Sequence, residues 1–289
     1  MNTRYRGEAT RLAAAAAADR LDLVMTLGGD GTVNEAVNGL LGGSATADGK
    51  FQPPPQAADL PALGALPGGN ANVFVRSLGL PADPVDAAAR LIDDLAAGHL
   101  RRIGLGNANG RYFTFNAGLG LDAEVVRAVE GRRAHGRTLT PALYFRTALR
   151  QFYRVTDRRN AAITIDQPGG LADANAYLCI VSNSAPWTYL GTRPVYASPD
   201  ANFDTGLDLL ALRSLGTVAT ASALRQMLRN RGVPLRGRSV IARHDLAAID
   251  LRGSRPVAFQ LDGEYMGETE EVRFRAVPRA LRVIGLAGH

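Results

Sequence analysis

Cysteine is almost absent from this sequence, since Cys179 is the only one among 289 residues. A single thiol excludes an intrachain disulfide and favours a reducing compartment. Long apolar runs are absent too, because no stretch approaches the roughly 20 residues that a membrane-spanning helix needs. The alanine run 13–18 is flanked by charged residues, which predicts a helix rather than a signal peptide. We therefore expect a cytoplasmic protein, and peripheral contact with the inner face of the membrane stays open.

Histidine is also scarce, and its four positions show no metal-ligand spacing: His99, His135, His244 and His289. No zinc site, Ser-His-Asp set or nucleic-acid-binding motif stands out. The 46% hydrophobic and 21% charged content is that of a soluble globular protein, long enough for two domains. The net charge of +6 comes almost entirely from arginine and allows attraction to nucleotides or lipid headgroups.

The first hundred residues alternate between helix and strand patterns. Alanine-rich and 3.6-periodic segments predict helices, and short apolar runs ending in glycine predict buried strands. In chain order these are helix 7–20, strand 21–27, helix 32–41, strand 62–69 and helix 84–97, which Gly98 should end. Residues 42–61 are rich in glycine and proline and are expected to form a loop. This alternation predicts a parallel α/β domain over residues 1–103.

After about Ile103 the pattern changes to short β-like runs separated by turns. Such runs predict an antiparallel β-rich sandwich over residues 104–278, interrupted by helices at 139–155 and 217–231. The runs are 111–126, 160–166, 176–184, 207–212, 246–251, 257–264 and 271–276. Cys179 lies within one of them and is expected to be a small buried side chain.

The segment TLGGDGTVNEAVNGL (26–40) places one carboxylate, Asp30, among three glycines at a strand-to-helix junction. The backbone N–H groups and dipole of a helix start form a site for phosphate, and glycine lets the backbone approach it closely. A carboxylate beside a phosphate is repelled unless a cation lies between them, and Mg²⁺ suits that position. The alternative is that Asp30 only caps the following helix.

Two further turns carry polar residues. ALPGGNANVF (65–74) has paired glycines after an apolar run and presents Asn70 and Asn72, so it should face the same crevice as the first turn. FQLDGEYMG (259–267) places Asp262 and Glu264 around a glycine, where Glu264 could take a proton from a hydroxyl group. The alternative for this third segment is an ordinary β-turn with a solvated glutamate.

Together these segments resemble the diacylglycerol kinase catalytic family, which includes bacterial lipid kinases and sphingosine kinases. GGDGTVNEAVNGL resembles the nucleotide signature of that family, LPGGNANVFVRSLGLP its second glycine motif and LDGE its catalytic motif. GLGLDAEV (118–125) resembles the domain-junction motif, PDANFDTGLDLL (199–210) an acidic turn associated with magnesium, and TRYRGEA (3–9) the segment of a nucleotide-proximal threonine. The similarity spans nearly the whole chain in order.

The resemblance implies an α/β nucleotide-binding domain followed by the β-rich domain, with residues 279–289 returning to the first domain. It implies ATP and Mg²⁺ as cofactors and a lipid alcohol as acceptor. Glu264 would be the general base, with Asp30 and Asp122 as further catalytic residues that support the metal through water, and Asp204 a candidate structural metal ligand. The implied ATP-binding residues are Thr3, Gly28, Gly29, Asp30, Gly31, Thr32, Val33, Asn34, Glu35, Gly69 and Asn70.

Three departures from the family pattern stand out. The chain starts after the place of the family's first strand and Asn-Pro glycine turn, so we expect a misplaced start or a truncation, with an exposed apolar sheet edge. Val73 occupies a position that is often aspartate in the second motif. The acidic turn reads Asp204-Thr205-Gly206, where the family often has a second acidic or amide residue, so a structural metal could be weakened or absent.

Features that bear on the acceptor are less specific. Residues 131–159 carry eight arginines and one acid around an apolar helical stripe, which fits either a membrane-surface helix or a helix packed on the β domain. The loop 182–196, with Trp187, Tyr189 and Tyr196, could line an acyl pocket or simply pack. Diacylglycerol, a sphingoid base, an undecaprenyl-type alcohol and a glycolipid precursor all stay open as acceptors, as does the oligomeric state.

Two other functions fit part of this pattern. NAD kinases share the Gly-Gly-Asp-Gly-Thr signature, but LPGGNANVF and LDGE argue against that enzyme. A catalytically silent nucleotide- or lipid-binding protein is the other alternative, suggested by Val73 and by the absent first turn.

Overall fold

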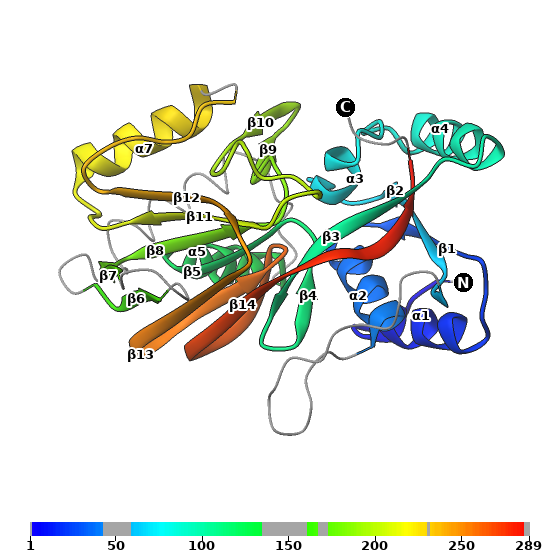
Figure 1. The fold of residues 1–289 in the computed structure, drawn as a ribbon, viewed down its shortest axis with the longest axis horizontal. Coiled ribbons are helices and arrows are strands. Elements are labelled where there is room, and N and C mark those ends of the chain that lie inside the picture. Colours follow the sequence, from blue (N-terminus) through cyan, green and yellow to red (C-terminus); the bar gives the residue numbers. More distant parts are fainter. Residues whose placement is uncertain (1, 43–58, 135–160, 167–172, 230–231, 286–289) are drawn as a thin grey trace.

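The computed structural model describes residues 2–42, 59–134, 161–166, 173–229 and 232–285. Within these residues a 12-stranded sheet runs in the order β1-β2-β14-β13-β5-β8-β11-β12, with β3, β4, β6 and β7 attached beside it. Figure 1 shows a smaller helical unit around β1 and β2 and a larger β-rich unit, with β14 and β3 extending between them. The predicted fold class, an α/β domain followed by a β-rich domain, is confirmed.

The smaller unit contains the predicted βα repeats. Strands β1 and β2 are parallel, with Leu23 opposite Ala62 and Gly28 opposite Pro67. Helix α4 starts where the Asp83 carboxylate accepts the backbone N–H groups of Val85 and Asp86, and it ends before Gly98, whose φ is +71°. The elements are α1 (Glu8–Ala18), β1 (Leu23–Gly28), α2 (Asp30–Leu41), β2 (Ala62–Pro67), α3 (Val73–Ser77) and α4 (Pro84–Ala96). Only the short α3 was not predicted; the predicted loop 42–61 lies largely outside the described residues.

The larger unit is built mainly from antiparallel strands. Its elements are β3 (Leu100–Ala108), β4 (Arg111–Phe113), β5 (Asn116–Gly120), α5 (Leu121–Ala134), β6 (Ile163–Asp166), β7 (Asp173–Ala176), β8 (Leu178–Ser182), β9 (Thr188–Leu190), β10 (Arg193–Val195), β11 (Leu207–Leu212), α7 (Thr217–Arg229), β12 (Val240–Leu246), β13 (Ala248–Leu261) and β14 (Glu264–Ile284). The predicted helix at 217–231 is confirmed over Thr217–Arg229 as α7, and residues 230–231 lie outside the described residues. The predicted helix 139–155 and most of the arginine-rich segment 131–159 lie outside the described residues.

One predicted β run is wrong in its second half, because α5 begins directly after β5. Gly120 ends the strand with a φ of +77°, which other residues adopt only with strain. Asp122 and Glu124 then occupy the first helical turn, where acidic side chains favour the positive end of the helix dipole.

Strands β8 and β11 are buried on both faces, so their side chains divide between two cores. Cys179, Val181 and Leu209 belong to the core shared with β13 and β14. Ile180 and Leu210 belong to a second core, which Met227 of α7 covers. Cys179 is fully buried as expected, and burial raises the pKa of its thiol.

Strand β14 connects the two units. It pairs antiparallel with β13 over its first half and with β3 further along, and it then runs parallel to β2 with Val283 opposite Leu63. Its last residues, including Leu281 and Val283, belong to the core of the smaller unit.

Strand β1 forms one end of the strand order, and its Met25 and Leu27 side chains are 46% and 66% exposed. No helix among the described residues is long and apolar enough to cross a bilayer.

Candidate active site

The two glycine turns that follow β1 and β2 are in direct contact. The N–H of Gly68 donates to the carbonyl of Gly28 over 2.8 Å. A Cβ atom placed on Gly69 would lie 2.5 Å from the Cα of Gly29, which is closer than real atoms approach. Glycine is therefore required where the turns cross, and the prediction that the two turns lie together is confirmed.

Asp30 bridges these two turns. Its carboxylate oxygens accept the backbone N–H groups of Val73 and Phe74, each over 3.1 Å, at the start of α3. Asp30 thus caps α3, and the alternative that it caps α2 is wrong, because the N-cap of α2 is Gly29 and has no side-chain cap bond. Burial raises the pKa of Asp30 to about 6, against the lowering effect of the two backbone hydrogen bonds.

Asn72 fixes the shape of the second glycine turn. Its side-chain Oδ1 accepts the Gly69 N–H over 2.8 Å, and its Nδ2 donates to the Gly69 carbonyl over 3.0 Å. Asn72 itself has a φ of +48° and is buried. Asn70, the residue predicted to contact ATP, is exposed at the tip of this turn.

The hairpin between β13 and β14 reaches into the same region. Its two turn residues, Asp262 and Gly263, have φ angles of +46° and +78°, which confirms the predicted Asp-Gly turn. The Asp262 side chain is 4% exposed, and burial raises its pKa. Its carboxylate accepts five hydrogen bonds, from Asn34 Nδ2, Thr114 N, Thr114 Oγ1, Phe115 N and Asn116 N. Because Asn34 belongs to α2, this carboxylate also ties the hairpin to the smaller unit.

Glu264, the residue after this turn, lies against the start of α2. A Cβ atom placed on Gly31 would be 2.6 Å from the Oε1 atom of Glu264. The other oxygen, Oε2, lies 2.9 Å from Nη2 of Arg6 and 3.5 Å from Nη2 of Arg111. The structure therefore brings the predicted base and the predicted phosphate-binding turn together. The two arginines were not predicted, because neither belongs to a recognisable pattern.

A buried amide connects the hairpin to α5. Gln260 is 1% exposed, and its Oε1 accepts the N–H of Gly263 over 2.9 Å. Its Nε2 donates to Asn116 Oδ1 over 2.9 Å and to Asp122 Oδ2 over 2.7 Å. Burial raises the pKa of Asp122 to about 6. Gln260 was missed by sequence reasoning, since one polar residue in an alternating strand is usually exposed.

The remaining predicted ATP-binding residues have varied surroundings. Thr3 is exposed, Thr32 is partly buried, and Val33 is packed in the core of the smaller unit. The Glu35 carboxylate accepts the N–H groups of Gly7 and Ala9 at the start of α1. The assignment of these residues to ATP stays a prediction.

Asp204 lies away from the hairpin, in an ion pair with Arg101 over 2.8 Å, and its side chain is 65% exposed. Across the described ranges, no group of three His, Cys, Asp or Glu side chains is arranged to hold a metal ion. The structural metal at Asp204 stays a prediction. The loop 182–196 reaches the second glycine motif, where Arg76 stacks on the Tyr189 ring 3.2 Å from its centre.

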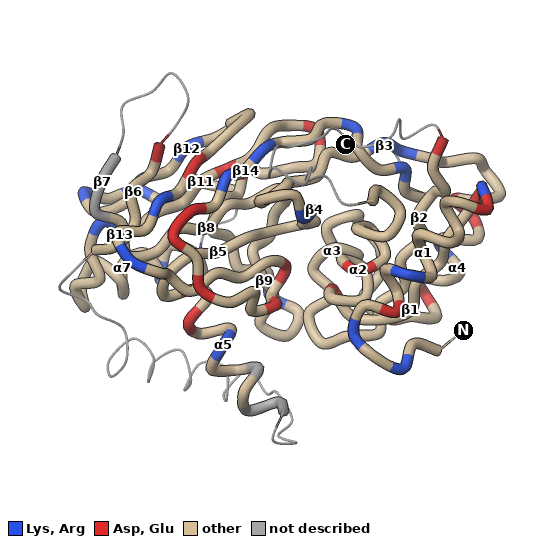
Figure 2. The backbone as a smooth tube through the Cα atoms, turned by 90° about the horizontal axis from the view of Figure 1, so that it is seen from below, with Lys and Arg blue, Asp and Glu red and all other residues tan. Residues whose placement is uncertain are grey.

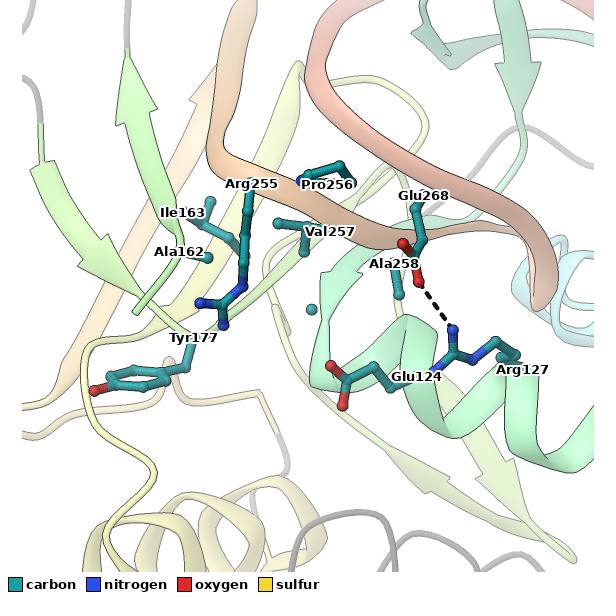
Figure 3. A pocket seen from close by; sticks show the side chains of 11 residues that line it. Glu124, Arg127, Ala162, Ile163, Tyr177, Arg255, Pro256, Val257, Ala258 and Glu268 are labelled. Atoms are coloured by element: carbon teal, nitrogen blue, oxygen red, sulfur yellow. Dashed lines mark hydrogen bonds and ion pairs between the residues drawn. The ribbon is translucent and has the colours of Figure 1, made fainter. Parts of the chain in front are cut away.

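A small cavity lies within the larger unit, away from the glycine turns. Its volume is about 80 Å³, and Figure 3 shows Glu124 and Arg255 pointing into it, with Glu268 paired to Arg127 at one side. Pockets for drug-sized ligands begin at about 300 Å³, so this cavity is too small for a nucleotide or a lipid chain. Charges of both signs are spread over both units (Figure 2), so charge alone does not single out a site. The glycine turns and the hairpin, which bring the predicted residues into contact, are the candidate site.

Comparison with known proteins agrees with this arrangement. Residues 1–108 match the diacylglycerol kinase catalytic domain, and residues 116–285 match the YegS C-terminal NAD kinase beta sandwich-like domain. A diacylglycerol kinase of Bacillus subtilis (strain 168) is 29% identical over 266 residues, which cover 90% of this chain and 77% of that protein. A diacylglycerol kinase of Staphylococcus aureus (strain JH9) is 26% identical over 265 residues, covering 91% and 74%.

Solved structures show the same fold. A crystal structure of a diacylglycerol kinase from Bacillus anthracis str. Sterne has a TM-score of 0.67 at 20% identity and covers 99% of this chain and 84% of that one. A second crystal structure from that organism has a TM-score of 0.71 at 24% identity, covering 98% and 84%. The two domain matches follow one another along the chain and meet at the hairpin and glycine turns. The chain therefore belongs to the family that joins a diacylglycerol kinase catalytic domain to a YegS-type C-terminal domain.

Proposed function

We propose that this protein is an ATP-dependent lipid kinase, which transfers the γ-phosphate of ATP to the hydroxyl of diacylglycerol or a related lipid alcohol. Membership of the family supports lipid kinase activity in general. The observation that carries the proposal is the contact between Glu264 of the larger unit and Gly31 at the start of α2. The proposed proton acceptor, Glu264, therefore lies against the proposed phosphate-binding start of α2.

The glycine turn suits the phosphates of ATP. The two turns cross at glycines, which have no side chains, so a ligand can come close to the backbone there. The dipole of α2 favours negative charge at the same place. Gly29, Gly31 and Thr32 would hold phosphate oxygens, with Gly28, Gly69, Asn70 and Thr3 near the nucleotide.

Mg²⁺ fits this site as a partner of ATP rather than as a metal held by protein alone. Magnesium commonly binds one or two carboxylates together with substrate phosphates and water, and Asp30 offers one carboxylate beside the turn. Asp30 would hold the ion through water. Asp122 would support this arrangement from α5, through its hydrogen bond with Gln260 next to the hairpin. The bound metal would supply charge neutralisation on the phosphates.

Glu264 would accept the proton of the lipid hydroxyl while the hydroxyl oxygen forms a bond to the γ-phosphorus. The bond from that phosphorus to the bridging oxygen breaks at the same time, and ADP leaves with the bonding electrons. Such a transfer depends on positioning and electrostatics more than on covalent chemistry. Asp262 would contribute by fixing the turn on which Glu264 stands.

Glu264→Gln is the test of this proposal. The variant should bind ATP at least as well as the wild type, because the amide keeps the shape of the side chain. Its turnover should fall at least about a hundredfold, the usual size of a general-base effect. ADP release would be measured with Mg²⁺ and detergent micelles containing diacylglycerol, a sphingoid base or no lipid.

Glu268→Gln is the matched control, since Glu268 lies on the same strand and pairs with Arg127 outside the glycine turns. Near-wild-type turnover of Glu264→Gln would exclude Glu264 as the base. ATP consumption that ignores every lipid but requires NAD⁺ would favour an NAD kinase. Nucleotide binding without turnover under any condition would favour a silent binding protein.

A further inference from the structure

Two guanidinium groups occupy the carboxylate of Glu264. Arg6 Nη2 and Arg111 Nη2 both approach its Oε2 atom, at 2.9 and 3.5 Å. A lipid hydroxyl that donates to Oε2 would have to displace at least one of these partners.

The two arginines differ in their freedom to move. Arg111 also donates to Asn34 Oδ1 over 2.8 Å and is 34% exposed, so it is held from two sides. Its Nε atom is buried and lacks a hydrogen-bond partner among the described residues. Arg6 is 61% exposed, so its side chain can leave Glu264 without disturbing a packed core.

The backbone beside Arg6 is nevertheless fixed to the phosphate-binding helix. The N–H groups of Gly7 and Ala9 donate to Glu35 of α2 over 2.8 and 3.2 Å, and Thr10 Oγ1 donates to the Glu35 carbonyl over 3.0 Å. Arg6 therefore combines a fixed backbone with a long side chain, within reach of the start of α2.

We propose that Arg6 binds the terminal phosphate of ATP, and that it leaves Glu264 to do so. The inference rests on the proposed kinase function. A terminal phosphate carries more negative charge than a carboxylate and accepts two parallel hydrogen bonds from a guanidinium group. Arrival of ATP would thereby remove one of the two guanidinium groups from Oε2, so that this oxygen becomes more accessible to the lipid hydroxyl when a phosphate is present to transfer.

The test measures nucleotide binding without catalysis. Titration calorimetry with Mg²⁺ would compare a non-hydrolysable ATP analogue with ADP, which lacks the terminal phosphate. Arg6→Gln should lower the affinity for the analogue about tenfold and change the affinity for ADP less than about twofold. Arg6→Lys should recover part of the lost affinity. Glu264→Gln should tighten binding of the analogue about two- to fivefold, because the Arg6–Glu264 ion pair no longer has to break. The gain is small because Arg6 is largely exposed.

The decisive measurement is the double variant. In the Arg6→Gln background, Glu264→Gln should no longer tighten binding of the analogue, because the Arg6–Glu264 pair is already absent and the Arg111–Glu264 pair does not have to break when the phosphate binds. Arg11→Gln is the matched control, since Arg11 is 63% exposed and pairs with Glu8 on the same helix. It should bind both nucleotides like the wild type.

Three outcomes would overturn the inference. Equal losses for the analogue and ADP in Arg6→Gln would exclude a contact with the terminal phosphate. Tightening by Glu264→Gln that persists without Arg6 would exclude the exchange between the two anions. Binding of neither nucleotide to the wild type would remove the proposed kinase function together with the inference.

Discussion

Gly31→Ala should separate stability from activity. Gly31 is the second residue of α2, and its φ does not lie in the left-handed region, so alanine can adopt the backbone conformation. Alanine is favoured over glycine in helices by about 1 kcal/mol, so the free energy of unfolding should stay constant or rise. The added Cβ would, however, lie 2.6 Å from Glu264 Oε1, where ordinary contact begins at 3.4 Å. The carboxylate must therefore retreat by about 0.8 Å, the difference between these distances.

A displacement near 1 Å at a reacting group can cost about a hundredfold in rate, and we expect kcat to fall by that order. Lipid-dependent ADP release would give the rate, and urea denaturation the free energy of unfolding. Gly131→Ala in α5 is the control, because a Cβ there meets no atom of the described residues within 4 Å. A Gly31→Ala enzyme with kcat within about twofold of wild type would refute the positioning of Glu264 described above.

Asp262→Asn should lower the free energy of unfolding in urea by about 3 kcal/mol or more. The amide would leave some of the buried donors around position 262 without an acceptor. A loss below about 0.5 kcal/mol would contradict this. The pKa of Asp122 is raised from 3.8 to about 6, so native protein holds a proton that unfolded protein releases, and stability should fall as pH rises through that interval. Asp122→Asn should reduce this fall by about 3 kcal/mol between pH 4 and 7, whereas the contribution of Asp30, whose pKa is also raised to about 6, should remain. The same pH dependence of unfolding in the variant and the wild type would disprove the prediction. Glu35→Ala should cost about 0.5–2 kcal/mol through the start of α1, and an unchanged melting temperature would argue against that contact.

Local patterns predicted the elements that carry the site. The apolar run before Gly28, the periodic Val33, Val37 and Leu40, and the Asp-Gly pair at 262–263 each specify structure over a few neighbouring residues. Their backbone preferences and burial agree with the final fold, so these predictions are confirmed.

The contacts of the site depend on long-range packing and could not be predicted from spacing. Asp30 caps α3, a helix of five residues that is too short for a periodic signal. Glu264 meets Gly31 and Arg6 only because the hairpin between β13 and β14 lies against the start of α2, a contact between residues far apart in the sequence. Gln260 has the same local pattern as an exposed strand residue, and only the placement of α5 against β13 buries it.

Strand β14 limits how this enzyme can accept its substrates. Its 21 residues lie between β13 and β2 in the strand order, so one continuous segment belongs to both halves of the molecule. Hinge opening would have to bend or unzip a hydrogen-bonded strand, which is costly compared with rotating an arginine or moving a surface loop. Substrate entry should therefore proceed by side-chain rearrangement around a rigid frame, and the molecule should melt in a single transition instead of half by half.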